Sequence, residues 1–436
     1  MKNSKNEVTE PGDTYKIAYI LHFFLGAGNL LPWNALITAV DYFGYLYPGR
    51  HVERVFSVAY MAASLLVLVL LLSFGGCRRN LSLRVRMNLG FSMFVLSLMA
   101  TPTMHWGWEK NGDAKMNMSS SKAYCVVVAS VLVCGLADGL IWGSLIGTAG
   151  KLPKQYMQAL FAGTASSGVL ISILRIITKA SLPQTPQGLK TSAQFYFIVS
   201  SAILIGCIIS CNLLYQLPVM QLHYKNFQYF QPTHSCSTPR FRQTFTKIRF
   251  PGFGVFMIYT VTLSIFPGFL AENIKSDLLK DWYPITLIAT YNVSDFVGKS
   301  LTSIYVMKGI GRATWGCMAR LVFYPLFIGC FRGPEWLRTE APVVVLTVML
   351  GLSNGYLTSV IMILAPKAVP QAEAEVAAIV MAVLLGMGLV AGSVIGPMEK
   401  LATVKLVGHL YILENDSFLA HSSSQNLNLL LYLYIP

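Results

Sequence analysis

Eleven apolar runs dominate this chain, and each is long enough to cross a lipid bilayer as a helix. A membrane-spanning helix needs about 20 predominantly apolar residues. Charged residues make up 12% of the chain, whereas soluble domains carry about 25%. We therefore predict an all-α integral membrane protein with eleven transmembrane helices. Their expected ranges are about 17–40, 55–74, 87–104, 123–146, 155–178, 194–217, 251–272, 282–306, 314–332, 341–365 and 375–397.

The gaps between these runs divide the chain. Most gaps are short, and the longest, 218–250, is polar and basic and separates six runs from five. Two bundles joined in this way commonly hold a solute site between them. The predicted parts are an N-terminal six-helix bundle (1–217), a basic cytoplasmic loop (218–250), a C-terminal five-helix bundle (251–397) and a divergent polar tail (398–436).

Lysine and arginine residues fall mainly in the gaps, so the net charge of +14 does not indicate a nucleic-acid partner. The basic clusters in 75–86 and 218–250 lie on one side of the predicted membrane, and the positive-inside rule makes that side cytoplasmic. We expect a cytoplasmic N-terminus and, with an odd number of spans, a C-terminus outside. Asn117 lies in an Asn-Met-Ser sequon in the outer gap 105–122 and is a candidate for N-glycosylation.

An acidic and a basic residue stand four apart inside the apolar run 282–306. On a helix, Asp295 and Lys299 would share one face, a turn apart. Ionisable residues within a membrane are costly and usually functional. A neutralised pair in one helix can also be a purely structural bridge. Both interpretations are open, and the pair is the strongest candidate for a solute site.

Other spans also carry polar residues. In the first span, Pro32 is expected to break or kink the helix. The next two residues, Trp33 and Asn34, offer an aromatic surface and an amide that suit a planar, hydrogen-bonding solute, although both could instead serve interfacial and interhelical packing. In the tenth span, the segment 351–356 indicates a helix break or a tight crossing, with Asn354 facing a cavity, where its amide would bind the solute.

The fourth span combines small residues with a carboxylate. Asp138 could bind a proton, a cation or a solute hydroxyl, or it could pair with Arg175 or Arg320. We expect Arg320, deep in the ninth span, to be paired and structural. The span also has a glycine every fourth residue, a pattern that allows close helix packing: Gly135, Gly139, Gly143 and Gly147.

The sequence has no Walker A motif, no His/Glu metal cluster and no Gly-x-Ser-x-Gly nucleophile motif. It therefore predicts neither an ATP-driven pump nor an enzyme, and no cofactor or metal is expected. Rings of charge or a filter motif, which are typical of channels, are not evident in the sequence.

Four segments resemble the equilibrative nucleoside transporters, and 166–180 is most similar to the plant members. The resemblance covers 17–396 and implies an eleven-helix relative of the major facilitator superfamily with six plus five helices. It also implies nucleoside transport by alternating access. The four segments are PWNALITAVDYF (32–43), GLIWGSLIGTAGKLP (139–153), YNVSDFVGK (291–299) and GLSNGYLTSVIMILAP (351–366).

The resemblance implies that Trp33 and Asn34 contribute to the solute site and that Asp295 and Lys299 engage the nucleoside. This chain departs from the family at several positions. Lys299 stands where the family usually has Arg, and a Lys lacks the planar fork that binds two acceptors at once. Trp142 and Asp138 stand where mammalian members have Gln and Gly, so Trp142 is a further solute-contact candidate. The tail beyond about residue 396 departs from the family pattern.

These features together predict a plasma-membrane secondary transporter of nucleosides, with nucleobases as a second solute class. Transport would be facilitated diffusion or would be coupled to protons, with Asp138 and Asp295 as the carriers, because a desolvated carboxylate can take up a proton. The alternatives are a major-facilitator-type transporter of another small polar solute and a non-transporting membrane receptor.

Overall fold

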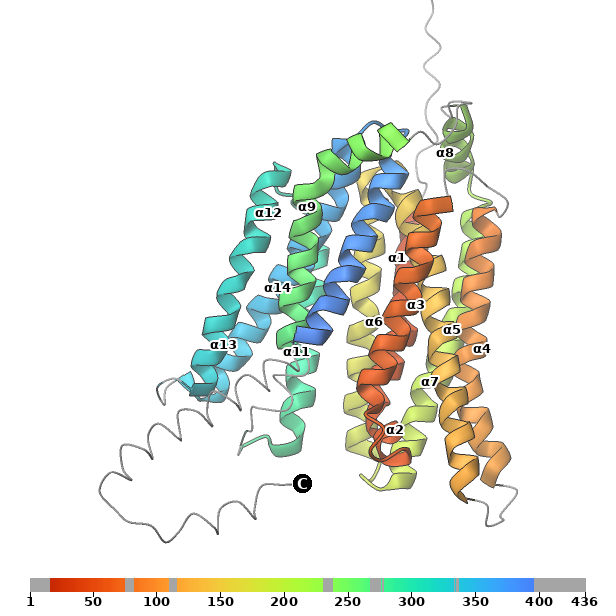
Figure 1. Ribbon diagram of the computed structural model, residues 1–436, viewed down its shortest axis with the longest axis vertical. Helices are drawn as coiled ribbons and strands as arrows, with labels where there is room; N and C mark the ends of the chain where they lie inside the picture. The colour runs from red at the N-terminus through yellow and green to blue at the C-terminus, as the bar shows by residue number, and fades with distance from the viewer. Residues whose placement is uncertain are drawn as a thin grey trace, which may run out of the picture.

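The computed structural model is built from helices arranged in two groups that lie side by side (Figure 1). It describes residues 16–74, 82–109, 116–229, 238–266, 276, 278–332, 334 and 337–395. The predicted tail 398–436 and the side chain of the predicted glycosylation site Asn117 lie outside the described part of the chain.

The first group is formed by the N-terminal half. In this group α1 packs against α6 and α7, and α5 packs against α3 and α4. Its helices are α1 (Ile17–Thr38), α2 (Val40–Leu46), α3 (Val52–Phe74), α4 (Leu83–Glu109), α5 (Met116–Lys151), α6 (Lys154–Ser181) and α7 (Pro186–Leu214).

The second group is formed by the C-terminal half, and α8 (Pro218–Tyr229) precedes it. Here α11 packs against α14, and α9 packs against α12. The contact of α6 with α11 joins the two groups. The elements are α9 (Thr238–Ile265), η2 (Lys280–Trp282), α11 (Tyr283–Leu301), α12 (Ile310–Ala319), η3 (Arg320–Val322), α13 (Phe323–Arg332), α14 (Glu340–Leu364), η5 (Ala365–Ala368) and a last helix, Ala374–Ile395.

In the described part of the chain, ten helical segments are long and apolar enough to cross a membrane. They match ten of the predicted spans, which confirms an all-α membrane protein. The remaining predicted span forms α11, which carries Asp295 and Lys299 and is not among the ten. The count of eleven therefore stays a prediction. Large apolar side chains such as Leu96 and Ile209 are exposed on the outside, as expected of a lipid-facing surface.

Two predicted gaps are largely helical. The helix α4 continues to Glu109 and α5 begins at Met116, so most of 105–122 is helical. The helix α8 and the start of α9 occupy most of 218–250, so this segment is not a long loop. Counting apolar residues detects only the part of a helix that lies in lipid, whereas backbone hydrogen bonds continue into polar sequence.

Two predicted helix breaks are absent from the described helices. The prediction of a break at Pro32 is wrong, because α1 runs without interruption from Ile17 to Thr38 with Pro32 buried inside it. Packing of α1 against α6 and α7 holds the helix together through the proline. The segment 351–356 is likewise continuous helix within α14, so its glycines mark a tight crossing and not a break.

Glycine makes that crossing possible. A Cβ atom added at Gly298, Gly351 or Gly355 would lie within 3.0 Å of atoms of the opposite helix, α14 or α11. This close approach brings Asn354 next to Asp295. The predicted ridge on α5 works in the same way: Gly135 and Gly139 lie against the backbone of α3. Gly143 meets leucine side chains of α3, and Gly147 instead faces the last helix, Ala374–Ile395.

Candidate functional site

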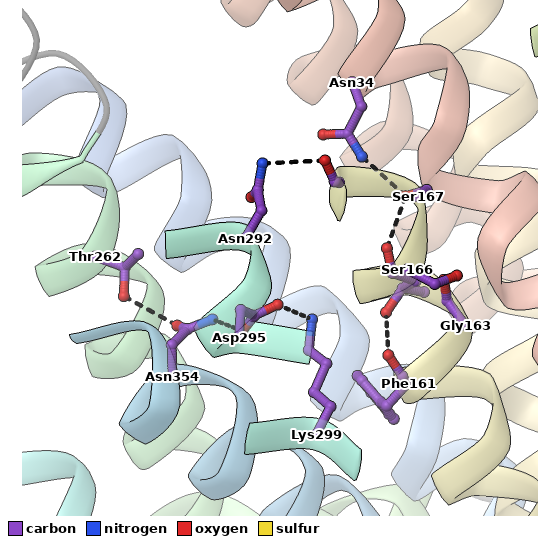
Figure 2. A network of polar contacts seen from close by, with 12 residues as sticks. Asn34, Phe161, Gly163, Ser166, Ser167, Thr262, Asn292, Asp295, Lys299 and Asn354 are labelled. Atoms are coloured by element: carbon purple, nitrogen blue, oxygen red, sulfur yellow. Dashed lines mark hydrogen bonds and ion pairs between the residues drawn. The ribbon is translucent and has the colours of Figure 1, made fainter. Parts of the chain in front are cut away.

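The predicted charge pair is formed and buried inside the C-terminal group. On α11, Lys299 Nζ lies 2.8 Å from Asp295 Oδ2, one helical turn apart. Asp295 is 7% exposed and Lys299 is 4% exposed. The pairing follows from the i, i+4 spacing, and mutual neutralisation lowers the cost of burying either charge. Figure 2 shows the pair between α14 and α6.

A chain of hydrogen bonds continues from the other oxygen of Asp295. The Asn354 side-chain amide nitrogen on α14 donates to Asp295 Oδ1 at 2.7 Å. Asn354 Oδ1 in turn accepts from the Thr262 hydroxyl on α9 at 3.0 Å (Figure 2). Both ends of the Asn354 amide are therefore engaged with protein, and the side chain is 3% exposed.

Arg320 lies at the far end of this chain, in η3. Its Nη2 donates to the Thr262 hydroxyl at 2.6 Å, and its Nη1 donates to Ser353 Oγ at 2.7 Å and to the Leu350 carbonyl oxygen at 3.2 Å. Arg320 was predicted to be paired; among the described residues its hydrogen-bond partners are these neutral oxygens, and no carboxylate lies among them. The buried cluster thus holds two cations and one carboxylate.

A second polar cluster lies in the N-terminal group around Asp138. Its carboxylate accepts from the Ser64 hydroxyl at 2.6 Å and from the Asn29 amide at 3.2 Å. The alternative in which Asp138 pairs with Arg175 or Arg320 is wrong, because the described partners of Asp138 are Ser64 and Asn29. Arg175 instead forms an ion pair with Asp41 of α2, because both lie towards the same end of the N-terminal group.

Aromatic residues lie next to the Asp138 cluster. The ring of Trp33 packs against Tyr60 with centroids 4.9 Å apart, and Tyr60 lies beside Asp138. Trp142 follows Asp138 by one turn of α5 and meets Phe161 of α6 edge to face at 5.5 Å. The structure therefore brings Trp33, Trp142 and Asp138 to one region of the N-terminal group.

The two clusters approach each other across α6. Asn34 of α1 donates to Ser167 Oγ at 2.8 Å, and Asn292 of α11 donates to Ser172 Oγ at 2.8 Å and to the Gly168 carbonyl at 3.2 Å. Figure 2 shows Asn34 and Asn292 on either side of this helix. Asn292 precedes Asp295 by one turn, so the α6 surface connects Asn34 with the charge pair.

Sequence reasoning did not single out Thr262, Ser64 or Asn292 as partners of these residues. Hydroxyl residues in membrane helices commonly bond to their own backbone, so Thr262 and Ser64 gave no distinguishing signal. Asn292 lies in the same polar stretch as Asp295, and its amide inside an apolar run was the one available indication.

Comparison with known proteins places these features in a family. A family model described as nucleoside transporter matches residues 128–232 and 227–398. The chain is 62% identical over 387 residues to equilibrative nucleotide transporter 8 of Arabidopsis thaliana, covering 89% of this chain and 96% of that protein. It is 47% identical to equilibrative nucleotide transporter 1 of the same plant, covering 88% and 86%.

Solved structures support the fold. The proton:xylose symporter XylE, a major facilitator superfamily protein, superimposes with a TM-score of 0.59 at 14% identity over 91% of each chain. The outward conformation of FucP, of the same superfamily, gives a TM-score of 0.59 at 11% identity over 89% of this chain and 91% of that chain. The family match, the high identity to plant relatives and this fold lead to one conclusion: the chain is a membrane transporter that belongs to the equilibrative nucleoside transporter family.

Proposed function

We propose that this protein carries nucleosides, with nucleobases as a second solute class, across the membrane by alternating access. The observation that carries the proposal is the buried Asp295–Lys299 pair of α11 in a member of this transporter family. A carboxylate held by an ammonium and an amide can accept hydrogen bonds from the hydroxyls of a ribose. The high identity to two plant relatives called nucleotide transporters supports a solute of this chemistry.

The proposed binding roles follow from the placement of each side chain. Asp295 accepts from sugar hydroxyls, and Lys299 pairs with it and orients it. Trp33 and Trp142 offer aromatic faces to the base, and Asn34 offers an amide. Asn354 was predicted to face the solute, but its two ends are bonded to Asp295 and Thr262, so we assign it to holding Asp295.

Alternating access is proposed to move the bundle 1–217 against the bundle 251–397. Contacts between them occur near both ends of the helices. At one end, Lys151 pairs with Glu375, and the Gln371 amide donates to the Lys151 carbonyl at 2.6 Å. At the other end, Lys179 donates to the Asp281 carbonyl at 2.6 Å. Breaking one set while keeping the other would open the path to one side.

The proposed setting is the lipid bilayer of the plasma membrane, with the N-terminus in the cytoplasm and the C-terminus outside. The basic clusters in 75–86 and 218–250 support this orientation. Glycosylation of Asn117 tests it. In a eukaryotic host we expect a glycosidase to shift the mobility of the protein, and Asn117→Gln to abolish that shift. Equal mobility of the wild type and Asn117→Gln before glycosidase treatment would contradict a glycan at Asn117.

Proton coupling is the second part of the proposal, and it rests on Asp138. Among the described residues this carboxylate is held by neutral donors, unlike Asp295 with its lysine. A carboxylate without a cation beside it is the better candidate to take up and release a proton during the cycle. Coupled uptake should rise at acidic external pH and fall with a protonophore, and Asp138→Asn should remove both effects. Uptake indifferent to pH and to the protonophore would establish facilitated diffusion instead.

The solute class is tested by uptake of labelled nucleosides and nucleobases into transport-deficient cells that express the chain. We expect saturable uptake of uridine and adenosine that unlabelled nucleosides inhibit. Uptake of neither class, at confirmed surface expression, would favour a transporter of another polar solute or a receptor.

A further inference from the structure

Arg320 is a cation buried without an acidic partner in the part of the chain that the structure describes. It is 2% exposed, and its hydrogen bonds go to Thr262, Ser353 and the Leu350 carbonyl. An ionisable side chain within a membrane is rare, and by default it indicates a functional site. Two side chains, Thr262 and Asn354, connect the guanidinium to Asp295 through hydrogen bonds.

The orientation of each group in that chain is fixed by chemistry. An ionised carboxylate only accepts hydrogen bonds, so the amide nitrogen of Asn354 must face Asp295. Asn354 Oδ1 then faces Thr262 and needs a donor. Arg320 can only donate, and it does so to the Thr262 oxygen. The hydroxyl hydrogen of Thr262 is left for two acceptors, Asn354 Oδ1 at 3.0 Å and the Ile258 carbonyl at 2.8 Å.

We propose that Arg320 and Thr262 are positioning residues that hold Asp295 through Asn354. The inference rests on the proposed function, since it concerns the same solute site. In this hydrogen-bond chain the two oxygens of the Asp295 carboxylate differ in their partners. Oδ1 accepts a hydrogen bond from Asn354, which is bonded to Thr262, and Thr262 accepts from Arg320. Among the residues that the structure describes, Oδ2 is held by Lys299 of its own helix alone.

This division has a consequence for transport. A ribose hydroxyl can replace Lys299 at Oδ2, or share that oxygen with it, while Oδ1 stays fixed. The second cation, Arg320, keeps a positive charge near Asp295 when Lys299 moves. Hydrogen bonds in such a chain strengthen one another in a low-dielectric interior. Loss of Thr262 should therefore weaken binding of solutes that have ribose hydroxyls more than binding of those that lack them.

The test compares Thr262→Val, which removes the hydroxyl and keeps the shape, with Thr262→Ser, which keeps the hydroxyl. For Thr262→Val we expect KM for uridine to rise about tenfold, the size of one lost buried hydrogen bond, with the maximal rate per surface molecule unchanged. KM for 2′,3′-dideoxyuridine should change less than about twofold by the same reasoning. Thr262→Ser should match the wild type. Equal effects on both nucleosides, or no effect on either, would overturn the proposal.

A second measurement does not depend on transport. Thermal unfolding of the purified protein in detergent is compared for Thr262→Val, Asp295→Asn and the double variant. If hydrogen bonds link Thr262 with Asp295, the shifts in Tm of the single variants will not add up to that of the double variant. If the two residues act independently, the shifts will be additive. If the wild type carries no nucleoside, the proposed function fails, but the double-variant cycle still tests the hydrogen-bond chain. Additive shifts in Tm would overturn the proposal that Thr262 and Asp295 are linked.

Discussion

Asp295 and Lys299 can share the buried face of α11 because each removes most of the cost of burying the other. Removing one partner of a buried pair leaves an uncompensated charge, which costs about 3–5 kcal/mol. We expect Lys299→Ala to lower the Tm of the purified protein and to abolish nucleoside uptake. Lys299→Arg keeps the charge and should retain folding. The matched control is Glu53→Gln, which neutralises an exposed carboxylate at the start of α3 and should lower Tm far less, because it removes only a weak interaction with the helix dipole.

A purely structural bridge makes a different prediction from a solute site. Exchanging the two residues, as Asp295→Lys with Lys299→Asp, preserves a bridge within α11 but moves the carboxylate away from Asn354. We expect the exchanged protein to lose nucleoside uptake and to have a lower Tm, because a lysine at position 295 cannot accept the hydrogen bond from Asn354 and lies nearer to the cationic Arg320. Retained uptake would support the structural interpretation of the pair.

The sequence predicted those site residues whose charge is unusual inside an apolar run. Asp295, Lys299 and Asp138 are conspicuous because charges are rare in apolar runs. Their partners were not predictable: Asp138 is held by Ser64 and Asn29, and not by an arginine. Serine, threonine and asparagine can bond within their own helix or across to another, and the sequence does not distinguish these cases.

The crossing of α11 and α14 sets the geometry of the site at the scale of helices. Gly355 lies against the backbone of Asp295, closer than a Cβ atom would allow. We expect Gly355→Ala to push the two helices apart, to lower stability by about 1–3 kcal/mol as overpacking does, and to reduce uptake. The measurements are Tm in detergent and uptake at matched expression.

Gly311 offers a matched control, because it also lies in a helix, α12, and a Cβ atom there would meet nothing within 4 Å. Gly311→Ala should leave Tm equal or slightly raised, since Ala is the better helix former. A similar fall in Tm for both variants would show that the close crossing is not what makes Gly355 necessary.

Helices were predicted better than their ends and irregularities. Apolar length identifies the part of a helix in lipid, which is why ten spans were found. It does not report where polar sequence continues a helix, as in α4 and α9, nor whether neighbours hold a proline within one, as at Pro32. The glycines of 351–356 fitted either a break or a crossing, and only the partner helix decides between them.

The two groups of helices contact each other near both ends, so the whole molecule must break different contacts to open to each side. We expect Glu375→Gln to loosen the end where Lys151 pairs with Glu375. Hydrogen–deuterium exchange should then become faster in peptides covering 147–154 and 371–379. Exchange in these peptides should not change in Glu53→Gln. Unchanged exchange in Glu375→Gln would contradict a closing role for the pair.

The sequence predicted least about how the helices of the two groups pack against one another. Helices in a membrane are apolar on most faces, so periodicity does not reveal which face meets which neighbour. The number of bundles followed from spacing, but the position of α6 between Asn34 and Asn292 came only from the structure. The same holds for the contact of Gly147 with the last helix.

The central claim is that Asp295 binds the nucleoside that this protein carries. The most direct measurement is uptake of labelled uridine and adenosine in transport-deficient cells expressing the wild type or Asp295→Asn at equal surface density. Loss of a charge-assisted hydrogen bond predicts a fall in uptake of at least about tenfold at low solute concentration, with Glu53→Gln unaffected. Uptake by Asp295→Asn equal to that of the wild type would contradict the claim.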